Sequence, residues 1–282
     1  MRYSIRALAL SIALILVSGN GFSEIVNWEK LLKESVDDEG YAKPGKGIDI
    51  IYTKPASEKE WGEIVADQFG LDYYKKSYAF VVGISRFRDG KAFETLNNAK
   101  DSIRMAKFLA DEAGYDYVHL LSEEKAGQQR IKSIMLDTFR TQIDENDTFL
   151  FYWSGHGTTV DEKGFFPLFS SNSQRLSSMI AMDDILDWDK LLKAKQAFYL
   201  LDSCFSGLAT TTMSDKVPLE IEDLAGPSRH IFMAGTKRQE TIALKAKQTS
   251  IFTMSLLEGL QGNADGSYPD FPPDGVISAR EL

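Results

Sequence analysis

The sequence predicts an α/β fold in which a mostly parallel sheet carries helices on both of its faces. Short apolar runs without polar alternation are typical of strands buried on both sides, and the clearest is Tyr78–Ile84. Segments with helical spacing of apolar residues separate these runs along the chain. Strand and helix patterns that alternate in this way indicate parallel strands joined by helical crossovers. Functional residues of such sheets gather at the carboxyl ends of the strands.

The remaining elements are expected at short intervals after this strand. A helix is expected at 97–113, because Ile103, Phe108 and Leu109 approximate one apolar face. The others, in chain order, are a strand at 117–121, a helix at 128–143, a strand at 148–153, a helix at 183–192, strands at 197–201 and 230–234, and a helix at 251–260.

Residues 1–23 have the composition of a secretory signal peptide. Arg2 and Arg6 precede an apolar run of eleven residues, and small residues follow it. This run is shorter than the roughly 20 residues that a membrane-spanning helix needs. We therefore expect export, to the periplasm or the exterior, and no stable membrane span after signal removal. The alternative is an uncleaved N-terminal anchor.

Residues 24–76 form an extension without a catalytic motif. Helical patterns occur around Trp28 and from Glu58 to Phe69. The extension is interpreted either as packed on the main domain or as a pro-segment, which cleavage at Lys75 or Lys76 would release.

The main domain is expected to cover residues 77–282. Ser278, followed three residues later by Glu281, is the pattern of a helix start. That helix is not present, because the sequence stops at Leu282. One interpretation is therefore a domain truncated at its carboxyl end.

Charge excludes one class of partner. The chain has 32 basic and 41 acidic residues, a formal net charge of −9. Nucleic-acid binding needs a basic surface that neutralises phosphates, so no nucleic-acid partner is expected. An acidic protein favours cationic peptides or metal ions.

Cys204 is the only cysteine and cannot form an intramolecular disulfide. An inert buried thiol and an intermolecular bridge are two interpretations, but its surroundings favour a nucleophile. It follows the strand at 197–201, and His156 follows the strand at 148–153 within Ser-Gly-His-Gly. If these strands are parallel neighbours, both side chains emerge at one edge of the sheet.

In a dyad of Cys204 and His156, the imidazole would activate the thiol as a nucleophile. A thiol with a pKa near 8.5 is only slightly ionised at neutral pH, and a neighbouring imidazole can remove its proton. The imidazole then protonates the leaving amine. The backbone amides of Gly157 and Cys204 are the candidate donors to the oxyanion.

The segment from Tyr78 to Leu282 resembles the caspase-like peptidases of family C14 in clan CD, and among them the metacaspases and their bacterial relatives. The resemblance implies a caspase-like fold, endopeptidase activity and a thioester acyl-enzyme. Its matching features are the first strand at Val81–Ser85, the approach to the first helix from Leu96 to Asp101, the S-G-H-G turn, the D-S-C-x-S-G turn and the segment Ile251–Met254.

The resemblance also bears on the P1 residue, which lies on the amino side of the scissile bond. Caspases that cut after Asp typically have Gln two residues before the catalytic cysteine, where this chain has Asp202. Asp101 stands where metacaspases place an acid of the substrate pocket. Two carboxylates favour Arg or Lys at P1. The other interpretation of Asp101 is a solvated carboxylate in the first turn of a helix.

Metacaspases often need calcium as an activator, although no cofactor is required for the chemistry. Asp183 and Asp184 lie where part of that site is expected, and carboxylates suit calcium. Phe169 and Thr211 stand where other acids are usual. Calcium is therefore only an optional activator here, and Asp183 and Asp184 alternatively just begin a helix.

Residues 208–226 are expected to form an exposed loop in which the protein processes itself. An acidic pocket needs a basic residue, and Lys216 is the only one between Cys204 and Arg229. Exposed loops are also the preferred sites of proteolysis.

Three other functions agree less well with the sequence. A non-catalytic caspase-like scaffold is disfavoured because both dyad residues are present. A legumain-like or gingipain-like peptidase of the same clan is disfavoured by Asp101 and Asp202. A serine hydrolase is disfavoured because neither Ser203 nor Ser206 lies in a G-x-S-x-G turn.

Overall fold

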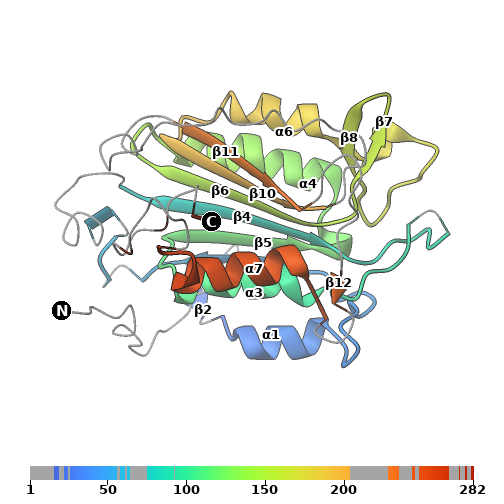
Figure 1. Cartoon of the computed structure of the whole chain (residues 1–282), viewed down its shortest axis with the longest axis horizontal. Coiled ribbons are helices and arrows are strands. Elements are labelled where there is room, and N and C mark those ends of the chain that lie inside the picture. Colours follow the sequence, from blue (N-terminus) through green and yellow to red (C-terminus); the bar gives the residue numbers. More distant parts are fainter. Residues whose placement is uncertain are drawn as a thin grey trace.

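The computed structural model describes residues 16–18, 22–24, 26–55, 58–60, 62–63, 75–91, 93–203, 228–234, 243–244, 248–266, 273, 277 and 281–282. Within these residues, the centre of the molecule is an eight-stranded sheet with the order β11-β10-β6-β4-β5-β3-β1-β2 (Figure 1).

Five neighbouring strands of this sheet run parallel to one another. Each expected strand is confirmed, with ends that differ by no more than two residues. They are β4 (Ser77–Ile84), β5 (Tyr117–Ser122), β6 (Thr148–Gly155), β10 (Gln196–Asp202) and β11 (Ser228–Met233).

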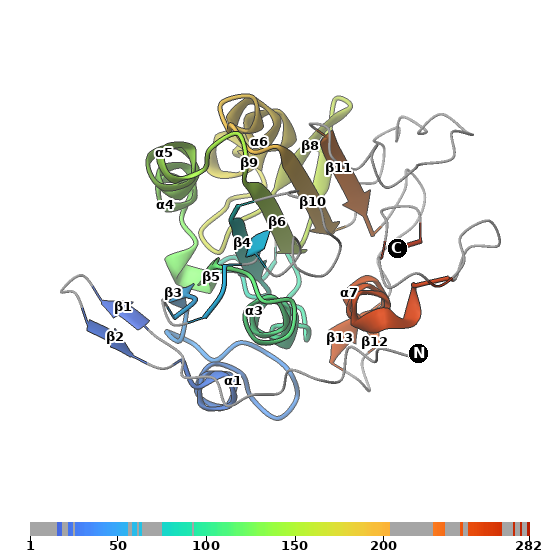
Figure 2. The same cartoon turned by 90° about the vertical axis from the view of Figure 1, so that its left-hand side faces the viewer.

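Helices cover both faces of the sheet, as predicted (Figure 2). One face carries α1 (Trp28–Ser35), α3 (Lys100–Asp111) and α7 (Ile251–Glu258), and the last continues as a π turn at Gly259–Asn263. The other face carries α4 (Gln128–Ser133), α5 (Arg140–Gln142) and α6 (Met182–Asp189). A π turn at Ile134–Phe139 joins α4 to α5, where one regular helix was expected. Single 3₁₀ turns lie at Glu123–Lys125 and Leu176–Ser178.

The central strand β4 shows why its sequence lacks polar alternation. All of its residues are buried. Phe80 and Val82 pack into the core under α4 and α6, whereas Ala79 and Val81 pack into the core under α3 and α7. Burial of an apolar side chain of this size contributes about 1.5–3 kcal/mol. Both faces therefore select apolar residues.

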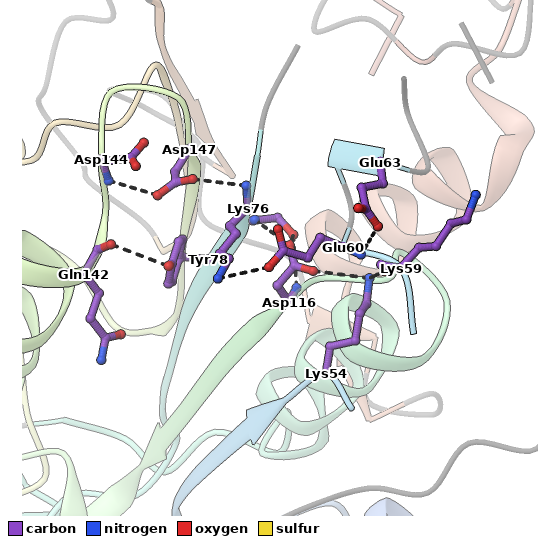
Figure 3. A network of polar contacts seen from close by, with 11 residues as sticks. Lys54, Lys59, Glu60, Glu63, Lys76, Tyr78, Asp116, Gln142, Asp144 and Asp147 are labelled. Carbon is purple, nitrogen blue, oxygen red and sulfur yellow. Dashed lines mark hydrogen bonds and ion pairs between the residues drawn. The ribbon is translucent and has the colours of Figure 1, made fainter. Parts of the chain in front are cut away.

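Residues from the N-terminal extension take part in the sheet. Strand β3 (Asp49–Thr53) of the extension pairs antiparallel with β5. At the edge follow β1 (Leu16–Ser18) and β2 (Phe22–Glu24), which apart from Glu24 belong to the predicted signal peptide. Lys54 Nζ lies 3.4 Å from Asp116 Oδ1 in a nearly buried ion pair (Figure 3). The extension is thus packed on the main domain. Most of the helix expected at 58–69 lies outside the described residues.

Two further groups of short strands were not anticipated. β7 (Thr158–Val160), β8 (Lys163–Phe166) and β9 (Ile180–Ala181) form a small antiparallel sheet directly after β6, and β12 (Ala243–Leu244) pairs with β13 (Thr249–Ser250) before α7. Strands of two to four residues are too short to show a pattern in the sequence. No helix in the described part of the chain is long and apolar enough to cross a membrane.

Candidate active site

The ends of β6 and β10 lie next to each other, which is the condition that the predicted dyad requires. The two strands are parallel neighbours, and the last aligned pair is Ser154 with Asp202. His156 follows Ser154 by two residues, and Cys204 follows Asp202 by two residues. Cys204 itself lies outside the described residues.

The loop after β4 holds the imidazole of His156. Its Nε2 lies 2.8 Å from the backbone carbonyl oxygen of Glu94. The rings of Phe87 and Phe93 pack against it, with centroid distances of 5.2 and 6.1 Å. A carbonyl only accepts hydrogen bonds, so Nε2 carries the proton and Nδ1 of the neutral ring keeps a lone pair. This tautomer can accept a proton from a thiol.

Glycine is required at the last position of β6, directly before this histidine. A Cβ atom on Gly155 would lie 2.8 Å from the carbonyl oxygen of Ile84 on the neighbouring strand. Such contacts force the backbone to shift, so a side chain would displace His156. Gly157 follows and is partly exposed. Its role as an oxyanion donor stays a prediction.

Asp101 and Asp202 come together although they lie on different elements. Asp101 is in the first turn of α3 and Asp202 ends β10, with exposures of 0% and 2%. Ser250 connects them: its amide donates to Asp101 Oδ2 at 2.9 Å, and its hydroxyl donates to Asp202 Oδ2. The hydroxyl of Thr249 also donates to Asp101. Asp101 is therefore not a solvated carboxylate.

Burial dominates the electrostatics of this pair. It raises the pKa of Asp101 to about 7, opposed by the hydrogen bonds from Thr249 and Ser250 and reinforced by the charge of Asp202. Burial likewise raises the pKa of Asp202 to about 6. Asp202 Oδ1 has no hydrogen-bond partner within the described part of the chain. A buried acceptor without a donor is unfavourable, so a ligand with N–H groups would gain by reaching it.

Comparison with known families decides the identity of this arrangement. The caspase domain model, Peptidase_C14, matches residues 76–271. The chain belongs to the caspase domain family. Its sheet and helices are accordingly a caspase-like fold, and the family indicates a cysteine peptidase that acts on protein or peptide substrates.

Solved structures with a similar fold include a protein from Geobacter sulfurreducens, with 17% identity and a TM-score of 0.48 over 67% of this chain and 83% of that one. Caspase-1 from Spodoptera frugiperda has 14% identity and a TM-score of 0.44 over 67% and 69%. The Drosophila initiator caspase Dronc has 13% identity and a TM-score of 0.33 over 48% and 56%. No curated protein matches the chain.

The caspase domain does not fit calcium at the expected acids. Asp183 and Asp184 are exposed in the first turn of α6. Asp183 Oδ2 lies 3.3 Å from Lys163 Nζ in an ion pair. Asp184 Oδ2 accepts a hydrogen bond from the amide of Ala181 at 3.1 Å, which caps the helix. Each carboxylate thus already has a partner in the protein.

The surroundings of Phe169, at a further position where an acid was expected, are also unsuitable for calcium. Phe169 replaces an acid there, and the guanidinium groups of Arg86 and Arg88 lie 5.0 and 5.5 Å from the centroid of its ring. Two arginine cations repel a divalent cation. No three His, Cys, Asp or Glu side chains are grouped to hold a metal ion among the residues that the structure describes.

Several residues of the site were missed by sequence analysis. Glu94 contributes a backbone carbonyl, for which the sequence holds no side-chain signal. Thr249, Ser250 and Thr253 contribute hydroxyl groups near the carboxylates. Ser250 also caps α7, because its hydroxyl accepts from the amide of Thr253 at 2.9 Å. A Ser before a predicted helix is a detectable cap signal. Lys216 lies outside the described residues.

Proposed function

We propose that the protein is a cysteine endopeptidase that cleaves after Arg or Lys with Cys204 as nucleophile and His156 as base. The observation that carries the proposal is the alignment of Ser154 with Asp202 on adjacent parallel strands. Parallel neighbours end at the same edge of a sheet, which supports a dyad built from the residues two positions further along the chain, His156 and Cys204. The bond between His156 Nε2 and the Glu94 carbonyl supports the required tautomer.

In this mechanism, Nδ1 of His156 takes the proton of the Cys204 thiol. The thiolate attacks the scissile carbonyl carbon, and the amides of Gly157 and Cys204 stabilise the oxyanion. His156 then donates its proton to the leaving amine, and the C–N bond breaks to leave a thioester. Water, deprotonated by His156, attacks the thioester, which releases the acid product and restores the thiol.

Charge and burial support a basic P1 residue. Asp101 and Asp202 form a buried anionic pair, and Asp202 Oδ1 lacks a donor from the described residues. A guanidinium or ammonium group supplies both the charge and the N–H that this oxygen needs. An acidic P1 residue would meet carboxylates in a region of low dielectric constant.

The test uses fluorogenic peptides that differ only at P1, with Arg, Lys, Asp or Asn. We expect cleavage after Arg and Lys to exceed cleavage after Asp by at least about 100-fold, as expected for a buried charge contact. Preference for Asn would favour the legumain-like alternative, and no cleavage of any peptide would favour the scaffold. Because the described acids do not fit calcium, a chelator should not change the rates.

Two statements about the rest of the chain stay predictions. Residues 1–23 are expected to direct export, and N-terminal sequencing of the mature protein tests this. Residues 24–76 are expected to stay attached to the peptidase domain, because β3 pairs with β5.

A further inference from the structure

Thr253 is buried at the start of α7 and links two other buried residues, Tyr152 and Asp202, by hydrogen bonds. It has 0% exposure, and its Oγ1 lies 2.6 Å from Asp202 Oδ2. The same oxygen lies 2.5 Å from the hydroxyl of Tyr152 on β6. Three elements, β6, α7 and β10, therefore meet in one hydrogen-bonded chain.

The donor in each of these hydrogen bonds follows from the chemistry of the groups. An ionised carboxylate only accepts hydrogen bonds, so Thr253 donates to Asp202. The single proton of Thr253 is then used, and Tyr152 must donate to Thr253. Ser250 donates to the same Oδ2 atom. Two hydroxyls thus hold one oxygen of Asp202, and Oδ1 keeps no partner from the described residues.

We infer that Thr253, supported by Tyr152, is a positioning residue that fixes the carboxylate of Asp202 with Oδ1 turned to the P1 side chain. The inference rests on the proposed basic P1 specificity but adds the residues that orient the acid. Rotation of this carboxylate would break both hydrogen bonds to Oδ2, so binding of the substrate cation costs little further conformational freedom.

Two titratable groups face Asp202 from the elements packed against it. Asp101 faces it from α3, with Arg104 Nη1 3.9 Å from Asp101 Oδ1. Tyr152 faces it from β6, and α7 supplies only hydroxyl donors. Hydrogen bonds to the charged form lower a pKa, and those from Ser250 and Thr253 do so for Asp202. Loss of the Thr253 hydroxyl therefore raises the pKa of this carboxyl.

The experiment compares Thr253→Val, which keeps the shape and removes the hydroxyl, with Thr253→Ser, which keeps the hydroxyl. Thr148→Val is the matched control, because Thr148 is also a buried threonine, at the start of β6, but bonds only weakly, at 3.4 Å, to a backbone carbonyl. Thr253→Val should lower kcat/KM for a P1 Arg peptide about tenfold or more, mainly through KM, since a hydrogen bond to a charged group is lost. Thr253→Ser should recover most of the activity, and Tyr152→Phe should show a smaller loss.

A second readout does not depend on peptidase activity. The carboxyl carbon of Asp202 is followed by NMR during a pH titration, and Thr253→Val should move its midpoint to higher pH, whereas Thr148→Val should not. An unchanged midpoint overturns the inference even in an active enzyme. An equal loss of activity in Thr148→Val also overturns it, because general packing would then explain the effect. If the wild type cleaves no basic peptide but Thr253→Val still moves the midpoint to higher pH, only the proposed function is contradicted.

Discussion

Asp101 and Asp202 share one hydrogen-bond partner, since the amide of Ser250 donates to the first and its hydroxyl to the second. Two acids from α3 and β10 are thereby held in one buried site. Such a pair is unfavourable when both members are ionised and no cation is present. Its protonation should therefore control the binding of cations.

Binding of a cation should weaken as the pH falls. Burial raises the pKa of Asp101 to about 7 and that of Asp202 to about 6, so acidification through this range neutralises both. Affinity for agmatine, which carries a guanidinium group, should fall about tenfold for each pH unit below these values. Calorimetry on Cys204→Ala separates this effect from titration of the dyad. Equal affinity at about pH 5 and pH 8 would refute an anionic pocket.

Replacement of one acid should stabilise the empty protein at high pH. The folded-state pKa of Asp202 is raised, so the folded state binds more protons than the unfolded state between about pH 4 and 6, and stability falls as pH rises through this window. Asp202→Asn removes the buried charge and should raise Tm by roughly 5 °C at about pH 8. The gain should shrink towards about pH 4.

Asp183→Asn is the control for this measurement. Asp183 is exposed and forms an ion pair with Lys163, so its replacement should change Tm little. A similar gain in both variants would attribute the effect to net charge and not to burial.

The sequence was sufficient to predict the strands whose side chains are buried on both faces of the sheet. β4, β6 and β10 are apolar on both faces, so their positions could be predicted, whereas the pairing of β6 with β10 was a condition of the predicted dyad and came from the structure. The antiparallel strand β3 and the short strands β7, β8 and β9 could not, because their pairing depends on tertiary contacts. The same limit applies to the site: side-chain chemistry identified His156, but its orientation comes from a backbone carbonyl.

Removal of either proposed dyad residue should abolish cleavage and leave the fold intact. His156→Ala removes a partly exposed ring that packs against Phe87 and Phe93, and these two rings still contact each other, so little of the core is lost. Cys204→Ala removes the nucleophile. Each should lower kcat at least about 10²–10⁴-fold, the usual contribution of a positioned acid or base. Undiminished turnover by a purified variant, with an unchanged circular dichroism spectrum, would exclude this dyad.

Two basic residues outside the expected loop are poor sites of self-processing. The amide of Lys75 donates to the carbonyl of Asn146 at 2.8 Å, and the amide of Lys76 donates to Asp147 Oδ1 at 3.0 Å (Figure 3). The carbonyl of Lys76 accepts from the amide of Thr148 at 2.9 Å. A peptidase binds an extended substrate through these same backbone groups, so cleavage here would require the start of β4 to separate from its neighbours.

Self-processing should therefore occur after Lys216. An acidic pocket selects a basic residue, and Lys216 is the only one between Cys204 and Arg229. Pro218, at the second position after the scissile bond, should slow the reaction without preventing it. Active wild type should yield a fragment that begins at Val217, whereas Cys204→Ala and Lys216→Ala should not. N-terminal sequencing of the fragments checks this result. If an enzyme that cleaves Arg peptides yields no fragment beginning at Val217, Lys216 is not the processing site.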